Sequence, residues 1–453
     1  MSRDPTTTRM TNAILATVLL FVLAPCSTNA ETLRLEQAMN LARERAREVT
    51  AAQARHRAQT ARVDLARAQR RPQIRLSEVW LRTDSPSEVF GLQLNQERFS
   101  FPDFIASDPN HPAALSTATT RLEIELPVYT GGEVSTRIQQ AKLQASAADE
   151  TVRRQGDEAA LHAAEAFVQL AQAREQIALL ERSLKSVEAH RTLARALVEQ
   201  GVLVRSELLR AEVEQSRVAD LLAAAREQAT VAKAALSFRL SWDLDTDWTL
   251  APLSEPAPLG PSPNHWLQTA GERADLVAAR QHQRAAALEV DARKALRRPR
   301  IGVRARYDLV DDHLFGSHGQ NGAVMAVATL DVFAGGRHRA ARLAASHAAE
   351  AANTDLERFA ETIRLEIRQA YARARSALDR LATARSALSA AAETERIVTE
   401  RFRQGLLKTI DVLDAAAARR EAETRELVAR SEAHLARLRL AVAAGRSPES
   451  AME

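Results

Sequence analysis

At 453 residues the chain is longer than one ordinary compact domain. Hydrophobic residues make up 45% of it and aromatic residues only 4%, so the apolar side chains are mainly alanine, leucine and valine. A sequence rich in Ala, Leu, Glu and Arg is typical of long helices that pack closely side by side. The formal charge of +4 is small beside 62 basic and 58 acidic residues, which are interspersed, and this argues against nucleic acid as a partner.

The first 30 residues are typical of a secretory signal peptide. Arg3 and Arg9 precede an apolar run over residues 13–24, and residues 28–30 (Thr-Asn-Ala) offer a cleavage site of small residues. The apolar run is too short to cross a bilayer as a helix. We therefore expect a mature chain that begins near Glu31, outside the cytoplasm.

Cys26 is the only cysteine, which excludes an intrachain disulfide. The segment that ends at Cys26 loosely resembles a lipobox, although Pro25 fits that signal poorly. Lipidation of Cys26 is therefore an alternative to simple cleavage after Ala30.

An internal repeat organises the mature chain. Two separate short segments of the first half each recur 204 positions later, a coincidence that chance rarely produces. A third recurs at a shift of 227, so the first half carries 23 more residues in the connector between its strands. The matching segments are Leu126–Gly132 and Leu330–Gly336, Gln200-Gly201 and Gln404-Gly405, and Arg70–Pro72 and Arg297–Pro299.

The repeat predicts a domain organisation. A proline-rich stretch between the halves is typical of a linker. We expect a signal peptide over residues 1–30, a first structural repeat over 31–250, the linker over 251–263, a second repeat over 264–446 and a C-terminal tail over 447–453.

Each half has the pattern helix, strand, connector, strand, long helix, turn and helix. The first helix of each half stops before a proline, as proline requires. Each long helix would extend about 100 Å at 1.5 Å per residue. In chain order we predict a helix over 33–70, strands over 73–83 and 121–128, a long helix over 133–199, a helix over 264–297, strands over 300–309 and 323–333, and a long helix over 337–403.

The long helices carry a coiled-coil pattern. Successive apolar positions are spaced four and then three residues apart in alternation, and the abundant alanine allows helices to approach closely. A generic fibrous coiled coil would show the same period. The positions are Ile363, Ile367, Ala370, Ala374, Ala377, Leu381, Ala384, Leu388 and Ala391, and 204 residues earlier Ala159, Ala163, Ala166, Leu170, Ala173, Ile177, Leu180, Leu184 and Val187.

The four strands have the length of tilted transmembrane strands, about ten residues each. Two of them alternate strictly, which is typical of half-buried strands. Leu122, Ile124, Leu126 and Val128 would face lipid, with Tyr129 and Phe333 at one interface. The residues predicted to face a wet lumen are Arg121, Glu123, Glu125, Arg304 and Arg306.

Four strands cannot close a barrel, and an open edge in lipid would leave backbone groups unpaired. Several copies of the chain must therefore complete one barrel. The alternative is a soluble antiparallel sheet with one polar face. We expect the connector over residues 84–117 to be extracellular, with Phe99, Phe101 and Phe104 against the barrel rim.

The segment from Phe402 to Asp414 resembles the helical-tip turn of TolC-type outer-membrane efflux proteins, with Asp-Val-Leu-Asp six residues after Gly405. Together with the tandem repeat and the strand-Gly-Gly-helix junctions, the resemblance covers almost the whole mature chain. It implies a mainly α-helical fold with a membrane β-barrel. Three copies would form a twelve-stranded barrel above a tapering tunnel of antiparallel coiled coils.

The same resemblance implies a channel in the outer membrane of a Gram-negative bacterium, with a large periplasmic portion. It would be the exit duct of a tripartite efflux or secretion system. Its partners would be outer-membrane lipid, two further copies of the chain, a periplasmic adaptor (membrane fusion protein) and an inner-membrane transporter of the RND, ABC or MFS type. The alternatives are a periplasmic adaptor and an envelope-tethered structural coiled coil.

In the family, the two aspartates of this element line the periplasmic entrance. Here they are Asp411 and Asp414, three apart and so on one helix face. Three copies would form carboxylate rings, which favour cations; the alternative is a pair of solvated carboxylates. In the first repeat Glu207 and Arg210 stand at the matching positions, so the charge at the entrance would be partly compensated.

The sequence departs from the family prototype at two gate positions. Phe402 replaces a tyrosine and Leu407 replaces an arginine, and both of those prototype residues belong to a polar network of the closed state. Neither side chain here can make the same bonds.

The turns between the long helices and their partners resemble adaptor-docking tips. Glycine ends the helix, and exposed apolar residues suit helix-to-helix docking. The alternative is an ordinary turn of a helical hairpin. The residues are Gly201, Val202 and Leu203 in the first repeat and Gly405, Leu406 and Leu407 in the second.

No catalytic motif is present among the eleven histidines and the carboxylates, so we expect neither enzymatic activity nor a cofactor. The densest polar group is Asp311-Asp312-His313 with His318. We interpret it as an exposed connector and not as a metal site.

Overall fold

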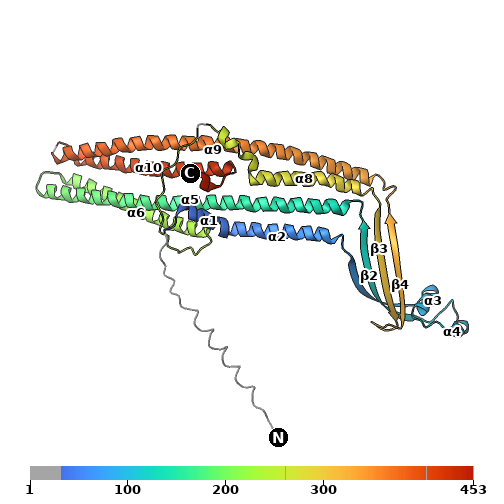
Figure 1. The fold of residues 1–453 in the computed structure, drawn as a ribbon. Coiled ribbons are helices and arrows are strands. Elements are labelled where there is room, and N and C mark those ends of the chain that lie inside the picture. Colours follow the sequence, from blue (N-terminus) through green and yellow to red (C-terminus); the bar gives the residue numbers. More distant parts are fainter. Residues whose placement is uncertain (1–31, 261, 405, 452–453) are drawn as a thin grey trace, which may run out of the picture.

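The computed structural model describes residues 32–260, 262–404 and 406–451. The predicted signal peptide, with Cys26, and the predicted tip residue Gly405 lie outside these ranges. The molecule is elongated, with two helical hairpins at one end and a single sheet at the other (Figure 1). No helix in the described ranges is both long and apolar enough to cross a bilayer.

The elements follow one another in two similar halves. The first half contains α1 (Leu35–Arg45), α2 (Arg47–Ala68), β1 (Gln73–Thr83), α3 (Pro86–Asn95), α4 (Phe101–Ala106), β2 (Leu115–Tyr129), α5 (Glu133–Glu199) and α6 (Arg205–Arg239). The second contains α7 (Asn264–Leu267), the 3-10 helix η1 (Ala270–Glu272), α8 (Ala274–Ala295), β3 (Arg300–Asp311), β4 (Gly319–Thr329), α9 (Arg337–Arg403), α10 (Thr409–Ala443) and the 3-10 helix η2 (Pro448–Ala451).

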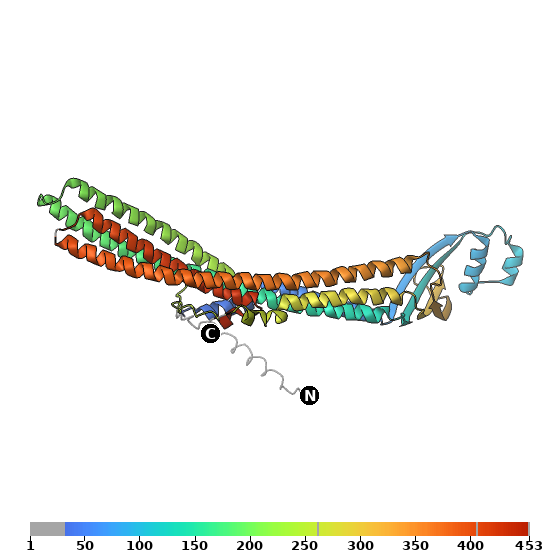
Figure 2. The ribbon, with the colours of Figure 1, turned by 90° about the horizontal axis from the view of Figure 1, so that it is seen from above.

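The long helices α5 and α9 have the predicted bounds, and each is 67 residues long. The heptad prediction is also confirmed, because every predicted position is buried or half-buried. The main apolar core lies midway along the molecule, around Phe167, Met39 and Ile367. Figure 2 shows that the molecule bends at this level, where the C-terminus also lies.

The helix predicted over residues 33–70 is not continuous. It breaks at Ala46, whose φ of −56° and ψ of 137° are not helical. Arg273, 227 positions later, breaks the second half at nearly the same angles, −57° and 126°. Both breaks lie in the buried middle of the molecule, where the Arg273 guanidinium donates to Glu366 at 2.7 Å and to the carbonyl of Ala443 at 3.0 Å.

The four strands form one antiparallel sheet in the order β1-β2-β3-β4. The bounds predicted for the last strand, 323–333, were wrong. Strand β4 begins at Gly319 and ends at Thr329, not at Phe333. Thr329 pairs with Arg300, the first residue of β3, so residues 330–333 have no partner on that strand. Phe333 therefore lies beyond the strand, and only Tyr129 occupies a strand end.

The connector between β1 and β2 is more ordered than predicted. It contains α3 and α4, and its phenylalanines form a small cluster of their own. The ring of Phe90 lies 5.3 Å from that of Phe99 and 5.5 Å from that of Phe104. The connector therefore has its own aromatic cluster, whose side chains are half-buried or exposed.

Candidate functional site: hairpin tips, inter-hairpin groove and charged sheet face

The two hairpin tips lie side by side at the end of the molecule farthest from the sheet (Figure 1). Helix α5 ends at Glu199, two residues before Gly201, whose φ of +74° favours glycine. The N–H of Val202 donates to the carbonyl of Leu197 at 2.9 Å, and that of Gly201 donates to Val198 at 3.0 Å. This is a Schellman arrangement, which satisfies the last carbonyls of the helix.

The second tip repeats this geometry. The N–H of Leu406 donates to the carbonyl of Arg401 at 3.0 Å, the same bond 204 positions later. Val202 and Leu406 are 67% and 68% exposed, whereas Leu203 and Leu407 are half-buried. The first tip thus presents Val202 and Val204, the latter 65% exposed, to solvent, and the second presents Leu406.

The predicted entrance carboxylates Asp411 and Asp414 have different environments. Asp411 lies in the first turn of α10 and accepts the backbone N–H of Lys408 at 2.9 Å, as an N3 carboxylate does in a capping box. Asp414 is exposed and lines a groove between the hairpins. Phe402 is half-buried in the last turn of α9.

The corresponding residues of the first repeat also differ from each other. Glu207 is half-buried, and its Oε2 is shielded from solvent without a hydrogen-bond partner among the described residues. Arg210 is exposed. Only Arg210 of the two could pair with a carboxylate, and among the described residues it forms no ion pair with Asp411 or Asp414.

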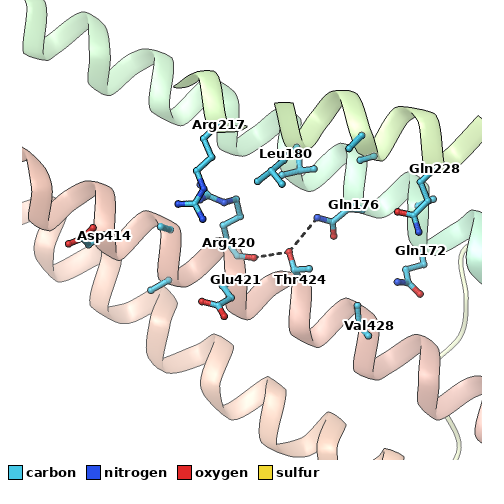
Figure 3. A pocket seen from close by; sticks show the side chains of 16 residues that line it. Gln172, Gln176, Leu180, Arg217, Gln228, Asp414, Arg420, Glu421, Thr424 and Val428 are labelled. Carbon is cyan, nitrogen blue, oxygen red and sulfur yellow. Dashed lines mark hydrogen bonds between the residues drawn. The ribbon is translucent and has the colours of Figure 1, made fainter. Parts of the chain in front are cut away.

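The groove that contains Asp414 lies between α5, α6 and α10 and has a volume of about 740 Å³ (Figure 3). Its lining includes alanines, and polar side chains of all three helices also line it. Gln176 of α5 donates to Thr424 of α10 at 3.4 Å across it. Arg217 extends from α6 toward Arg420.

A buried ion pair joins the two hairpins beside this groove. Arg420 is only 8% exposed, and its Nη2 donates to Glu214 Oε1 of α6 at 2.7 Å. Its Nη1 donates to Ser183 Oγ of α5 at 3.3 Å. One side chain of α10 therefore binds both helices of the other hairpin.

Arg420 was not among the residues predicted from the sequence, although the sequence carries a signal for it. Arg420 belongs to a row of residues spaced seven apart on α10, all of them buried: Leu413, Arg420, Leu427, His434 and Ala441. In a coiled coil such a row faces the partner helix. A charged residue in an apolar row is therefore a candidate for a specific polar contact.

His434 occupies the next polar position of the row. Burial lowers the pKa of His434 below its ordinary value, and the neighbouring Arg430 acts in the same direction. Its Nε2 is shielded and has no hydrogen-bond partner among the described residues. The linker passes close by, since Arg437 of α10 donates to the carbonyl of Pro258 at 2.8 Å.

The sheet has one charged face, defined by the residues predicted to face the lumen. In the register Arg121 pairs with Asp308, Glu123 with Arg306 and Glu125 with Arg304, so opposite charges face each other. Arg121 binds Asp308 at 2.8 and 3.0 Å, and Arg304 binds Glu125 at 3.0 Å. The other face carries mainly apolar residues, among them Ile74, Leu76, Leu122, Ile124 and Val324.

The sequence matches the outer membrane efflux protein family over residues 38–240 and 267–446. Outer membrane efflux protein BepC of Brucella suis biovar 1 (strain 1330) is 23% identical over 303 residues. That match covers 66% of this chain and 66% of BepC, just under two thirds of the relative's length.

Solved structures show the same fold. CusC, from a study of transmembrane channel formation, has a TM-score of 0.77 at 16% identity, over 94% of this chain and 96% of its own. The outer membrane protein VceC of Vibrio cholerae has a TM-score of 0.73 at 19% identity, over 91% and 96%. The predicted TolC-type fold of long helices and a small antiparallel sheet is confirmed. The chain belongs to the outer membrane efflux protein family and is a protein of the outer membrane.

Proposed function

We propose that three copies of this chain form an outer-membrane exit duct of a tripartite efflux or secretion system. The observation that carries the proposal is the open four-stranded sheet, in which β1 and β4 each have one neighbour within the described chain. Unpaired strand edges are prohibitively unfavourable in hydrocarbon. Pairing of β1 with β4 of the next copy would close four strands from each of three copies into one barrel.

The two faces of the sheet support this arrangement. The charged face suits a wet lumen, and the apolar face suits lipid. Large apolar side chains such as Ile74, Leu76 and Val324 are exposed on the apolar face of the single chain. Lipid would cover them in the membrane.

The hairpin tips would receive a periplasmic adaptor, which connects the duct to an inner-membrane transporter of the RND, ABC or MFS type. Val202 and Leu406 supply exposed apolar side chains there, and Leu203 and Leu407 lie beside them. Tight turns hold these residues in place, so an adaptor would meet a preformed surface.

At the entrance, three copies of Asp414, with Asp411 one turn away, would form acidic rings that favour cations. Because Phe402 and Leu407 cannot form the polar latch of the family prototype, another contact must hold the hairpins together. The buried contact of Arg420 with Glu214 and Ser183 is suited to that role.

The experiment is a deletion strain tested against drugs, bile salts and metals, together with fractionation of the envelope. We expect greater sensitivity to at least one class of compound, which the intact gene restores, and recovery of the protein with the outer membrane. Unchanged growth throughout would argue against efflux. Recovery as a periplasmic protein would favour an adaptor or a tethered coiled coil.

A further inference from the structure

The connector between β1 and β2, residues 84–114, is called the outer connector here. Helices α3 and α4 and the phenylalanine cluster give it a fixed structure. The matching connector of the second half, between β3 and β4, spans only residues 312–318. This feature therefore distinguishes the first half from the second.

The end of α3 is fastened to the charged face of the sheet. Gln96, only 1% exposed, donates to Thr117 Oγ1 at 2.7 Å and to the carbonyl of Ser116 at 3.1 Å. Alternate residues of a strand point to the same face. The Thr117 side chain therefore lies on the charged face, as does that of Arg121, four residues later on β2.

A second contact independently places this segment on the same face. Gly319 pairs with Val310, and Val310 pairs with Thr119, so all three positions belong to the charged face. A Cβ atom on Gly319 would lie 1.9 Å from the carbonyl oxygen of Asn95. Residues 95–96 therefore cross the charged face from β2 to β4 in direct contact with the strands.

Arg98 fixes the outer connector to the end of β3 and to the connector that follows it. Its Nη2 binds Asp311 Oδ1 at 3.0 Å, and its Nη1 binds Asp312. The carboxylate of Asp311, which is nearly fully buried, also accepts the backbone N–H of Asp312 at 2.8 Å and that of His318 at 3.0 Å. Asp311, Asp312 and His313 have the composition of a metal site, but the guanidinium of Arg98 already supplies the positive charge.

We propose that the outer connector is a fixed constriction of the channel at its outer mouth. The inference rests on the proposed function, because the charged face must face the lumen. In each of three copies the connector then projects inward from the strand ends and narrows the exit. Arg98, Gln96 and the close approach at Gly319 hold it there, so the constriction is built into the resting structure.

The test is the access of an external reagent to the charged face below the connector. Thr119→Cys places a thiol on the charged face, two residues farther along β2 than Thr117 and so farther from the outer connector. The chain without an introduced cysteine gives the background rate of labelling. Intact cells are treated with a maleimide on a polymer too large for general porins. We expect slow labelling in the Thr119→Cys protein and several-fold faster labelling when Arg98→Gln or Gly319→Ala is added.

Gly322→Ala is the matched control, because a Cβ atom there would come no closer than 3.5 Å to any neighbour, on the apolar face. It should leave the labelling rate unchanged. Equal rates in all four backgrounds would overturn the constriction. Asn110→Cys, within the connector itself, should label on intact cells; labelling only after lysis would show that the connector does not face outward and would overturn the proposed function as well.

Discussion

Arg420 of α10 and Glu214 of α6 form a buried ion pair at 2.7 Å, which joins the two helical hairpins near their tips. The two residues are 206 positions apart in the chain. Both side chains are largely withdrawn from water, and Glu214 has a second, longer ion pair with the exposed Arg217 at 3.7 Å.

Replacement of Arg420 by alanine should destabilise the protein. Glu214, largely buried, would keep only its longer contact with the exposed Arg217, at 3.7 Å, so the loss should stay below the roughly 3 kcal/mol of a buried charge left wholly unpaired. We expect a lower midpoint of thermal unfolding in detergent and a higher conductance in planar bilayers. Arg425→Ala is the control, because Arg425 pairs with Glu421 on the exposed surface of the same helix and such pairs contribute about 1 kcal/mol or less.

The double variant Arg420→Met with Glu214→Leu separates charge from packing. Replacing both members of a buried pair by apolar residues is commonly neutral or stabilising. The thermal midpoint should therefore return toward that of the wild type. A double variant as unstable as Arg420→Ala would show that the charge of Glu214 is not the cause.

The two entrance aspartates should respond differently to substitution. Replacement of both Asp411 and Asp414 by alanine should lower the cation preference of the conductance, because the acidic rings are lost. Asp411→Ala should in addition destabilise α10 by about 1 kcal/mol through loss of its cap, and Asp411→Glu should retain both properties. Unaltered ion selectivity would remove these residues from the pore lining.

Stability should fall in mild acid because of His434. Burial lowers the pKa of His434 in the folded state, so the unfolded chain binds a proton more readily. The contribution of the neutral His434 imidazole to the free energy of unfolding is fully present above about pH 6.5, the pKa of histidine in the unfolded chain. It decreases as the pH falls through that value. We expect a lower thermal midpoint at about pH 5.5 than at about pH 7.5, and a smaller difference in His434→Leu. His190, whose pKa burial also lowers, should contribute with the same sign.

The apolar tips should determine adaptor binding. Val202→Ser and Val204→Ser combined with Leu406→Ser remove the large exposed apolar side chains of both tips and should reduce the adaptor recovered with the protein after crosslinking. Val202→Ile combined with Leu406→Met keeps the apolar surface and should bind normally. Equal recovery with both pairs of variants, at equal abundance in the membrane, would exclude the tips as the docking surface.

The long helices could be predicted from sequence to the residue. Paired glycines precede both of them, a Gln-Gly step follows, and the heptad pattern persists over many turns between. Such signals are local and repeated, so single exceptions do not obscure them. The break at Ala46 was missed because nothing in its local sequence disfavours a helix.

The strand β4 was harder to place. Residues 323–333 are mostly alanine, valine and leucine, without an alternation that would fix the ends. Its observed end depends on β3, since Thr329 is opposite the first residue of that strand. Register against another strand is a tertiary property, which one segment does not contain.

The candidate site was only partly predictable for the same reason. The acidic element at 411–414 lies within one turn of helix and could be identified locally. The partner of Arg420 comes from the other half of the chain, and a lone arginine in a helix is normally assigned to solvent. Only the spacing of seven from Leu413 and Leu427 indicated that it faces inward.

The mass of the purified mature protein tests the account most directly. Extracted from outer membranes in detergent and measured by light scattering with correction for bound detergent, it should have the mass of three chains. The barrel can close only when β1 and β4 of neighbouring copies pair. A protein that remains monomeric and freely soluble in water without detergent would contradict the account.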